Sequence, residues 1–317
     1  MSLKSEKIGI IGSGLIGRSW AMLFASAGYQ IVIYDIESKQ IKSAATELEA
    51  QLYELEKEGL LRGQLSAQQQ FRCIKVTLDL KEAVENAIFI QECVPEILDL
   101  KKKVWKGVDE ICGPNTILSS STSTFVPSLI ASELKHRENA LVSHPVNPPY
   151  FVPLIEIVPS PWTKLEITER TRKLMEEIGQ APVTLSREIT GFAVNRIQFA
   201  ILNESWNLVA DGILSVEDVD KVMSEGLGRR YAFLGPLETA HLNAAGWMDY
   251  CSKYTNTIHS VSQTFKPLPK FEGPQTKEVA KQLEEKVPLK QLQARRNWRD
   301  LCLIKLAALK KSLGKRN

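Results

Sequence analysis

The chain has 317 residues, of which 44% are hydrophobic, so it is long enough to bury the cores of two domains. Its 40 basic and 37 acidic residues nearly balance, which excludes the strongly charged composition of nucleic-acid-binding and membrane-surface proteins. We therefore expect a globular protein whose partner is neither a nucleic acid nor a membrane.

The chain begins with a strand, a glycine-rich turn, a helix and a second strand. Residues 8–11 form an apolar run that leads into Gly12-Ser13-Gly14-Leu15-Ile16-Gly17, and an amphipathic pattern then continues to about residue 27. A second apolar run, residues 31–34, ends on Asp35. This order predicts a dinucleotide-binding unit. Gly12 permits a tight turn, Gly14 lets a pyrophosphate approach the backbone, and Gly17 lets the helix pack close to the strands.

The expected cofactor is NAD. Its pyrophosphate would meet the first turn of the helix, at Leu15 and Ile16, where free N–H groups and a partial positive charge favour an anion. Asp35 follows the glycines by about 20 residues, where a carboxylate can accept both ribose hydroxyls and would repel a 2′-phosphate. The next three residues include no arginine that could bind such a phosphate, so NAD is preferred over NADP. A glycine-rich turn without a cofactor is the alternative, and the surrounding strand–helix–strand pattern argues against it.

Strands and helices continue to alternate to about residue 185. The predicted strands are 73–77, 88–94, 116–119, 140–143, 154–158 and 181–185, and the predicted helices are 38–63, 98–111, 127–133 and 163–178. This alternation predicts a doubly wound, parallel sheet of the Rossmann type, extended at its edge by the last two strands. Only helical patterns follow, over 191–212, 215–224, 236–243, 247–263, 276–287 and 290–312. We expect an α/β, NAD-binding domain over residues 1–188 and an all-helical domain over 189–317.

His144 is the candidate acid/base among the four histidines. It follows the apolar run 140–143, so it stands at the carboxyl end of a parallel strand, where open α/β sheets bind ligands. Glu156 is a lone charge in the apolar strand 154–158, and a buried carboxylate needs a partner. If Glu156 bonds one imidazole nitrogen of His144, the other nitrogen can accept a proton from a substrate hydroxyl. The alternatives are a packing role for His144 and a backbone partner for Glu156.

The other histidines and the cysteines indicate no second reactive site. His136 lies in a charged run and is expected at the surface, His259 lies on an exposed helical turn, and His241 could face an interior or an interface. The five cysteines form no C-x-x-C pair and have no histidine at the spacing of metal ligands, so we expect free thiols and no metal site. The first strand leaves no space for a cleaved leader and no apolar run reaches membrane-spanning length. Together with the thiols, this predicts a cytoplasmic enzyme.

Four motifs resemble the L-3-hydroxyacyl-CoA dehydrogenase superfamily. In chain order they are Ser121-Thr122-Ser123, His144-Pro145-Val146-Asn147-Pro148, Leu154-Ile155-Glu156-Ile157-Val158 and Gly191-Phe192-Ala193-Val194-Asn195-Arg196. Longer strings are similar to the lambda-crystallin branch, the L-gulonate 3-dehydrogenases. They include Met223-Ser224-Glu225-Gly226-Leu227-Gly228 and Arg230-Tyr231-Ala232-Phe233-Leu234-Gly235-Pro236. The resemblance spans the chain and is more specific than the glycine-rich turn.

The resemblance implies a role for each residue of the catalytic site. It makes His144 the general acid/base and Glu156 its orienting partner. It makes Ser123 and Asn195 polar groups around the substrate oxygen, where they would stabilise developing charge. Ser123 could instead cap a helix, and Asn195 could instead make an interdomain hydrogen bond.

The resemblance also bears on the cofactor, the substrate and assembly. It implies that Glu96 and Lys101 contact the nicotinamide half of NAD, although Glu96 could equally be a charge at a helix N-terminus. Arg230, favoured over Arg229, could bind a substrate carboxylate from a loop that the glycines at 226 and 228 suggest, or it could be a surface arginine. The helical domain resembles the family's dimerisation domain, so a homodimer is expected.

The expected reaction oxidises the C3 hydroxyl of a small 3-hydroxy acid, which the resemblance implies to be L-gulonate, giving 3-dehydro-L-gulonate. Fatty-acyl enzymes of the superfamily usually carry two aromatic residues after the catalytic histidine. This chain has Pro145-Val146 there and a second proline after Pro148, which favours a substrate other than a long acyl-CoA. L-3-hydroxyacyl-CoA dehydrogenase and carnitine 3-dehydrogenase are the enzymatic alternatives. A structural lens crystallin is the alternative of another class, and the intact set of candidate site residues argues for an enzyme.

Overall fold

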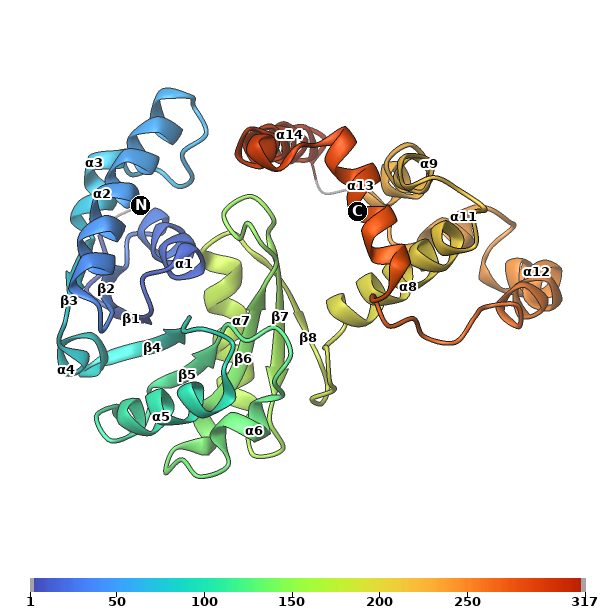
Figure 1. Cartoon of the computed structure of the whole chain (residues 1–317). Coiled ribbons are helices and arrows are strands. Elements are labelled where there is room, and N and C mark those ends of the chain that lie inside the picture. Colours follow the sequence, from blue (N-terminus) through green and yellow to red (C-terminus); the bar gives the residue numbers. More distant parts are fainter. Residues whose placement is uncertain (1–2, 315–317) are drawn as a thin grey trace. The chain divides into compact units, whose positions relative to one another are not determined.

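The computed structural model describes residues 3–314, and the chain divides between Asn195 and Arg196 into two compact units (Figure 1). The first unit is built on one eight-stranded sheet with the order β3-β2-β1-β4-β5-β6-β7-β8. The strands are β1 (Lys7–Ile11), β2 (Gln30–Tyr34), β3 (Ile74–Thr77), β4 (Ala87–Glu92), β5 (Ile117–Ser120), β6 (Ala140–Pro145), β7 (Leu154–Pro159) and β8 (Ala181–Thr184). The predicted Rossmann-type sheet is confirmed.

Helices cover both faces of this sheet. They are α1 (Leu15–Ser26), α2 (Ser38–Lys57), α3 (Ala67–Arg72), α4 (Leu80–Val84), α5 (Leu98–Asp109), α6 (Pro127–Ala131), the 3₁₀ turn η1 (Arg137–Asn139) and α7 (Leu165–Glu177). One core contains Ile10 and side chains of α1, α2 and α7, and the other contains Ile11 and side chains of α4, α5 and α6. Successive strand residues point to opposite faces, which is why strands buried on both faces are apolar at consecutive positions.

The strand pairing departs from the expected parallel sheet at one step. β6 and β7 are antiparallel, while every other neighbouring pair is parallel. The connection between them, residues 146–153, contains no helix and is too short for the crossover that parallel strands require. The antiparallel register places His144 opposite Glu156.

The predicted helix over 38–63 ends earlier than expected. α2 stops at Lys57, and Gly59 and Gly63 then take φ angles of 70° and 82°. These left-handed conformations suit glycine and interrupt the helix. A methyl group at Gly63 would lie 2.1 Å from the carbonyl oxygen of Ser26, so the close approach of the chain at this position also requires glycine.

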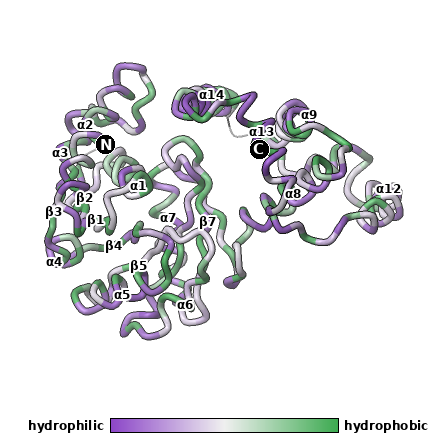
Figure 2. Tube along the Cα trace, viewed as in Figure 1, coloured by the Kyte–Doolittle hydropathy of each residue, from purple (hydrophilic) through white to green (hydrophobic). Residues whose placement is uncertain are grey.

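The second unit is helical, as predicted. α8 (Val194–Ala210) leads into it, followed by α9 (Val216–Lys221), the π-helix η2 (Val222–Leu227), α10 (Gly228–Tyr231), α11 (Pro236–Leu242), α12 (Trp247–Ser262), α13 (Pro274–Lys286), the 3₁₀ turn η3 (Leu289–Gln291) and α14 (Leu292–Ser312). Hydrophobic residues recur along these helices, interleaved with hydrophilic ones (Figure 2). Among its described residues, the buried apolar side chains are those of Val216 and Val219. Across residues 3–314, no helix combines the length and hydropathy needed to cross a membrane.

The prediction of a loop around the glycines at 226 and 228 is wrong, because the chain stays helical from Val216 to Tyr231. The N–H of Gly228 bonds to the carbonyl of Met223, a π-type turn that widens the helix at this point. A methyl group at Gly228 would lie 2.6 Å from that carbonyl oxygen, so the missing side chain permits the turn instead of ending the helix. Arg229 and Arg230 therefore lie on a helix.

The two glycines of this segment should respond in opposite ways to alanine. Gly226→Ala should raise the free energy of unfolding by about 0.5–1 kcal/mol, because alanine favours a helix and no atom lies within 4 Å of the added methyl. Gly228→Ala should lower it by about 1–3 kcal/mol, because the methyl overlaps the backbone of Met223. Urea denaturation followed by circular dichroism measures both. Stabilisation by both substitutions would contradict the π-turn.

Candidate functional site

The glycine-rich turn connects β1 to α1. Gly12 has a φ of 107°, and a side chain there would lie 2.8 Å from the carbonyl oxygen of Cys93. A methyl group at Gly17 would lie 2.0 Å from the carbonyl oxygen of Gly12, so only glycine lets the helix run so close to the turn. At Gly14 a methyl group would have no described atom within 4 Å. This open space adjoins the start of α1, which no side chain among residues 3–314 caps, and the arrangement could hold a pyrophosphate.

Asp35 follows β2 and faces this turn. Its Oδ2 accepts hydrogen bonds from the N–H of Ser13 at 2.8 Å and from the hydroxyl of Ser13 at 2.7 Å. Its Oδ1 accepts a longer bond from the N–H of Glu37 at 3.2 Å. Because each carboxylate oxygen can accept two hydrogen bonds, Asp35 is both oriented by the turn and able to accept a ribose hydroxyl.

His144 and Glu156 form the buried pair at the end of β6. Nδ1 of His144 is 2.7 Å from Oε2 of Glu156, so the contact expected from the sequence is present. The exposed fractions of the two side chains are 7% and 0%. With Nδ1 bonded to the carboxylate, Nε2 is the imidazole nitrogen that can exchange a proton with a ligand.

The second oxygen of Glu156 binds the start of α8. The N–H groups of Ala193 and Val194 donate to Oε1 at 2.7 and 2.9 Å. Phe192 and the glycine before it both have positive φ angles, of 50° and 77°, and this left-handed turn directs the two N–H groups at Glu156. Such a conformation is unfavourable for a phenylalanine, whose buried ring lies 5.5 Å from the ring of His144. Glu156 thus has both a histidine and a backbone partner.

Ser123 and Asn195 are joined by a hydrogen bond to the backbone. Nδ2 of the buried Asn195 donates to the carbonyl oxygen of Ser123 at 2.8 Å. Because an amide nitrogen carries two hydrogens, this bond leaves one N–H of Asn195 for a ligand. The side chain of Ser123 is exposed. Asn195 directly follows the residues that bind Glu156, so a chain of contacts connects Ser123 with His144.

Glu96 holds the loop that carries Ser123. Its Oε1 accepts hydrogen bonds from the hydroxyl of Thr122 at 2.5 Å and from the N–H groups of Ser123 and Thr124 at 3.0 and 3.2 Å. Burial disfavours the charge, but the Thr122 hydroxyl and the Lys101 ammonium nevertheless hold the pKa of Glu96 below its ordinary value. A charged carboxylate is therefore aimed at the backbone of this loop.

Lys101 lies between two carboxylates, one of which is that of Glu96. Its Nζ is 3.0 Å from Oε1 of Glu92 and 3.3 Å from Oε2 of Glu96. The side chains of Lys101 and Glu92 are each 1% exposed. Glu92 also accepts a hydrogen bond from the hydroxyl of Ser120 at 2.6 Å. The ammonium group is thus enclosed by protein acceptors, and its ion pair with Glu96 helps to hold that carboxylate in place.

Two residues of this region are not singled out by the sequence analysis. The sequence does mark Glu92, because this charged residue ends a strand whose residues 87–90 are all apolar and whose residue 91 is a glutamine. Phe192 occurs only within a family-like motif, and its left-handed backbone has no sequence signal because phenylalanine does not favour that conformation.

The second unit contributes other features. Arg230 is exposed on α10, and its neighbour Arg229 forms an ion pair with Glu225.

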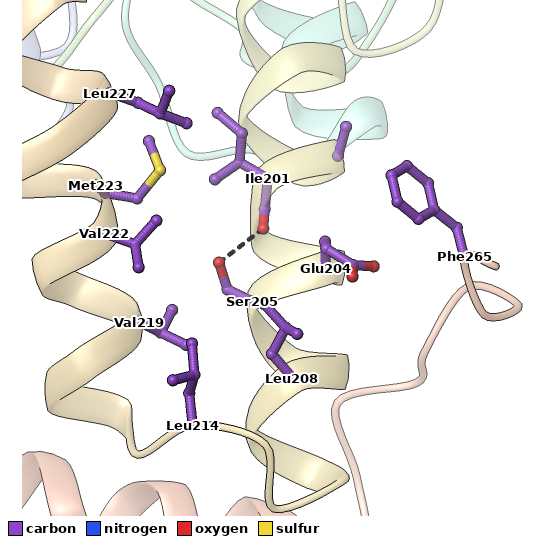
Figure 3. Close-up of a pocket in the computed structure, with 11 residues that line it drawn as sticks. Ile201, Glu204, Ser205, Leu208, Leu214, Val219, Val222, Met223, Leu227 and Phe265 are labelled. Carbon is purple, nitrogen blue, oxygen red and sulfur yellow. Dashed lines mark hydrogen bonds between the residues drawn. The ribbon is translucent and has the colours of Figure 1, made fainter. Parts of the chain in front are cut away.

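An apolar pocket lies between α8 and the α9–η2 segment, where Ile201 and Leu208 face Val219 and Met223 (Figure 3). None of the predicted site residues lines this pocket. Its side chains offer no acid/base pair for chemistry on a hydroxyl group.

Replacing Lys101 with methionine should destabilise the protein strongly, because the carboxylate of Glu92 would stay buried without its cation. We expect a loss of about 3–5 kcal/mol in the free energy of unfolding, measured by urea denaturation. Lys103→Met, at an exposed position of the same helix, is the matched control and should change it by less than about 0.5 kcal/mol. Equal effects of the two substitutions would contradict the role given to Lys101.

Comparison with known families matches both units. Residues 7–189 match the family model of the 3-hydroxyacyl-CoA dehydrogenase NAD binding domain, and residues 191–282 match that of the 3-hydroxyacyl-CoA dehydrogenase C-terminal domain. The NAD-binding match confirms the predicted cofactor.

Individual relatives cover between 75% and 98% of the chain. The Homo sapiens lambda-crystallin homolog is 50% identical over 303 residues, 95% of each chain. L-carnitine dehydrogenase of Oceanobacillus iheyensis is 36% identical over 237 residues, 75% of this chain and 76% of that protein. A solved structure, the NAD⁺-dependent dismutase 5-formyl-3-hydroxy-2-methylpyridine 4-carboxylic acid 5-dehydrogenase, has a TM-score of 0.82 at 25% identity, covering 98% of this chain and 99% of that one. The chain therefore belongs to the 3-hydroxyacyl-CoA dehydrogenase family of NAD-dependent oxidoreductases.

Proposed function

We propose that the chain oxidises the C3 hydroxyl of a small 3-hydroxy acid with NAD, and that the substrate is L-gulonate and the product 3-dehydro-L-gulonate. The observation that carries the chemistry is the buried hydrogen bond of 2.7 Å between Nδ1 of His144 and Oε2 of Glu156. Oxidation of a hydroxyl group needs a base that takes up its proton while the hydride leaves, and an oriented imidazole suits that task.

In this proposal His144 takes up the hydroxyl proton at Nε2. Glu156 fixes the imidazole tautomer through Nδ1, and its charge stabilises the imidazolium that forms. The cofactor, when bound, supplies the hydride acceptor. The hydroxyl of Ser123 and the second N–H of Asn195 donate to the substrate oxygen as negative charge develops on it. Phe192 packs against the imidazole ring and limits its movement.

The proposed cofactor contacts follow from the same geometry. The turn of Gly12, Gly14 and Gly17 and the first helical residues, Leu15 and Ile16, hold the pyrophosphate. Asp35 accepts the ribose hydroxyls. Glu96 contacts the nicotinamide half of the cofactor. The resemblance implies that Lys101 also contacts the nicotinamide half; because its side chain is 1% exposed, we propose that it acts there through Glu96, as a positioning residue.

The substrate assignment rests on sequence similarity and on chemistry. The strings around Met223 and Arg230 resemble the lambda-crystallin branch, and Pro145-Val146 departs from the aromatic pair of fatty-acyl enzymes. L-carnitine, for which one relative is named, is also a small 3-hydroxy acid. We assign the substrate carboxylate to Arg230, because a guanidinium forms paired, directional hydrogen bonds with a carboxylate.

We also propose that residues 1–188 form the NAD-binding domain and residues 189–317 the substrate and dimerisation domain of a cytoplasmic homodimer. Support for the dimer comes from large apolar side chains that are exposed on α8, with exposed fractions of 60% for Ile197, 44% for Phe199 and 47% for Leu202. Large apolar side chains that stay exposed on a helix are covered when another surface packs against them, as at an interface. All five cysteines are free thiols, as expected of a reducing compartment.

Initial rates of NADH formation test the substrate. We expect the highest kcat/KM with L-gulonate, lower values with L-carnitine and 3-hydroxybutyrate, and the lowest with 3-hydroxybutyryl-CoA. Replacing NAD with NADP should lower the rate, because Asp35 would repel the added phosphate. A preference for the acyl-CoA substrate would overturn the assignment to L-gulonate and leave the assignment of His144 untouched.

His144→Ala should lower kcat roughly 10²- to 10⁴-fold, the usual contribution of a positioned acid/base. NADH affinity, measured by fluorescence titration, should stay nearly unchanged, because His144 is assigned to the substrate hydroxyl. His259→Ala serves as the matched control at an exposed histidine and should keep full activity. Near-normal turnover by His144→Ala would exclude its acid/base role.

A further inference from the structure

Asp109, Cys112 and His136 bring three metal-ligating atoms together away from the catalytic residues. Nδ1 of His136 lies 2.9 Å from Oδ1 of Asp109 and 3.6 Å from Sγ of Cys112. All three ligand atoms lie within 4.8 Å of one another. Asp109 and Cys112 are buried, and the side chain of His136 is 24% exposed. His136 is therefore not the surface residue that its charged neighbours in the sequence suggest.

The spacing of these atoms is close to that of one face of a tetrahedral zinc site, and the oxygen of Asp109 and the sulfur of Cys112 lie within 4.8 Å of each other. With Zn–O, Zn–N and Zn–S bonds of about 2.0–2.3 Å, ligand atoms around the metal are about 3.3–3.6 Å apart. The distance of 3.6 Å between the sulfur and the nitrogen already fits. The 2.9 Å hydrogen bond between nitrogen and oxygen would open by a few tenths of an ångström when both atoms bind a metal.

The surroundings orient the carboxylate and favour a cation. Asp109 is the last residue of α5, and the C-terminal end of a helix carries partial negative charge. Its carboxylate accepts hydrogen bonds from the N–H groups of Lys135, at 2.6 Å, and of His136, at 3.1 Å. Such contacts hold a metal ligand in a fixed direction. The side chains of Lys106 and Lys135 line the adjoining cavity and oppose a cation, but the carboxylate and a thiolate together balance the double charge of zinc.

A catalytic arrangement of cysteine, histidine and aspartate does not fit these atoms. Asp109 and Cys112 both approach Nδ1 of His136, whereas a relay needs the carboxylate and the thiol on different imidazole nitrogens. A metal that displaces the thiol proton is the chemistry that suits the cluster.

We propose that Asp109, Cys112 and His136 bind one Zn²⁺, with water in the fourth position. A thiolate, an imidazole and a carboxylate form a ligand set suited to zinc and unsuited to Mg²⁺ or Ca²⁺, which prefer oxygen ligands. The ion clips the end of α5 to η1, the turn that directly precedes β6. His144 lies near the opposite end of β6 from this turn, so the ion does not reach the substrate. Its role is structural.

Zinc titration of the full chain tests the site. After treatment with a chelator and dialysis, calorimetric titration with ZnCl₂ and metal analysis should give one zinc per chain. Zinc should also raise the melting temperature of the wild type, because it binds the folded state. The variant C112S/H136Q should bind zinc at least 100-fold more weakly and show no such increase. The matched control C302S/H259Q removes an exposed cysteine and an exposed histidine and should bind zinc like the wild type.

Co²⁺ gives a second readout that does not depend on stability. Bound at this site, it should show the absorption bands of tetrahedral coordination and a thiolate-to-metal band that C112S removes. If C112S/H136Q fails to fold, by circular dichroism, the single variant H136Q replaces it, because it leaves the buried cysteine in place. Equal zinc affinity of the wild type and the site variant, or no binding by the wild type at stoichiometric concentration, would overturn the proposal.

Discussion

One buried carboxylate, that of Glu156, needs hydrogen-bond donors to balance its charge. The donors that it binds organise the candidate site. Glu156 lies in the apolar strand β7 with an exposed fraction of 0%, and a buried charge without partners is very unfavourable. Three donors surround it, the imidazole of His144 and two N–H groups at the start of α8. Each donor depends on a separate feature of the fold: the antiparallel register of β6 and β7, the left-handed backbone at Phe192, and the beginning of a helix. The requirement of one side chain thus ties together segments that are distant in the sequence.

The loop that carries Ser123 is held by a different kind of interaction. Glu156 is satisfied by N–H donors, whereas Glu92 and Glu96 share the buried ammonium group of Lys101. Glu96 then accepts hydrogen bonds from the backbone of the loop. Because the loop is positioned through its backbone, the hydroxyl of Ser123 is not needed to hold it. The loop can therefore be held in place while the hydroxyl of Ser123 stays available for a ligand.

The two units bury their apolar residues to very different degrees. In the first unit helices cover both faces of the sheet, so the apolar strands are enclosed within the chain itself. In the second unit large apolar side chains stay exposed along α8 and around the pocket in Figure 3. A surface helix needs only one apolar stripe for packing within its own domain, and additional apolar residues require another surface. This difference is the physical basis of the proposed homodimer.

Local patterns in the sequence determined the fold class, the cofactor and the candidate acid/base pair. The period of apolar residues reports strands and helices, the glycines and Asp35 report a dinucleotide turn, and a lone charge in an apolar strand identifies Glu156. The short link after His144 also contains the information that β6 and β7 are antiparallel, although alternation alone suggested a parallel sheet.

Only the tertiary structure decided the remaining features, because they arise where separate segments meet. The helix continues through Gly226 and Gly228 because a missing side chain allows a π-turn against Met223, although glycine by itself disfavours a helix. The left-handed conformation of Phe192 persists because it directs two N–H groups at a buried charge. The enclosure of Lys101 and the meeting of Cys112 with His136 likewise depend on packing between elements that the chain connects only distantly. Local residue preferences are weak compared with such contacts, so they cannot reveal them.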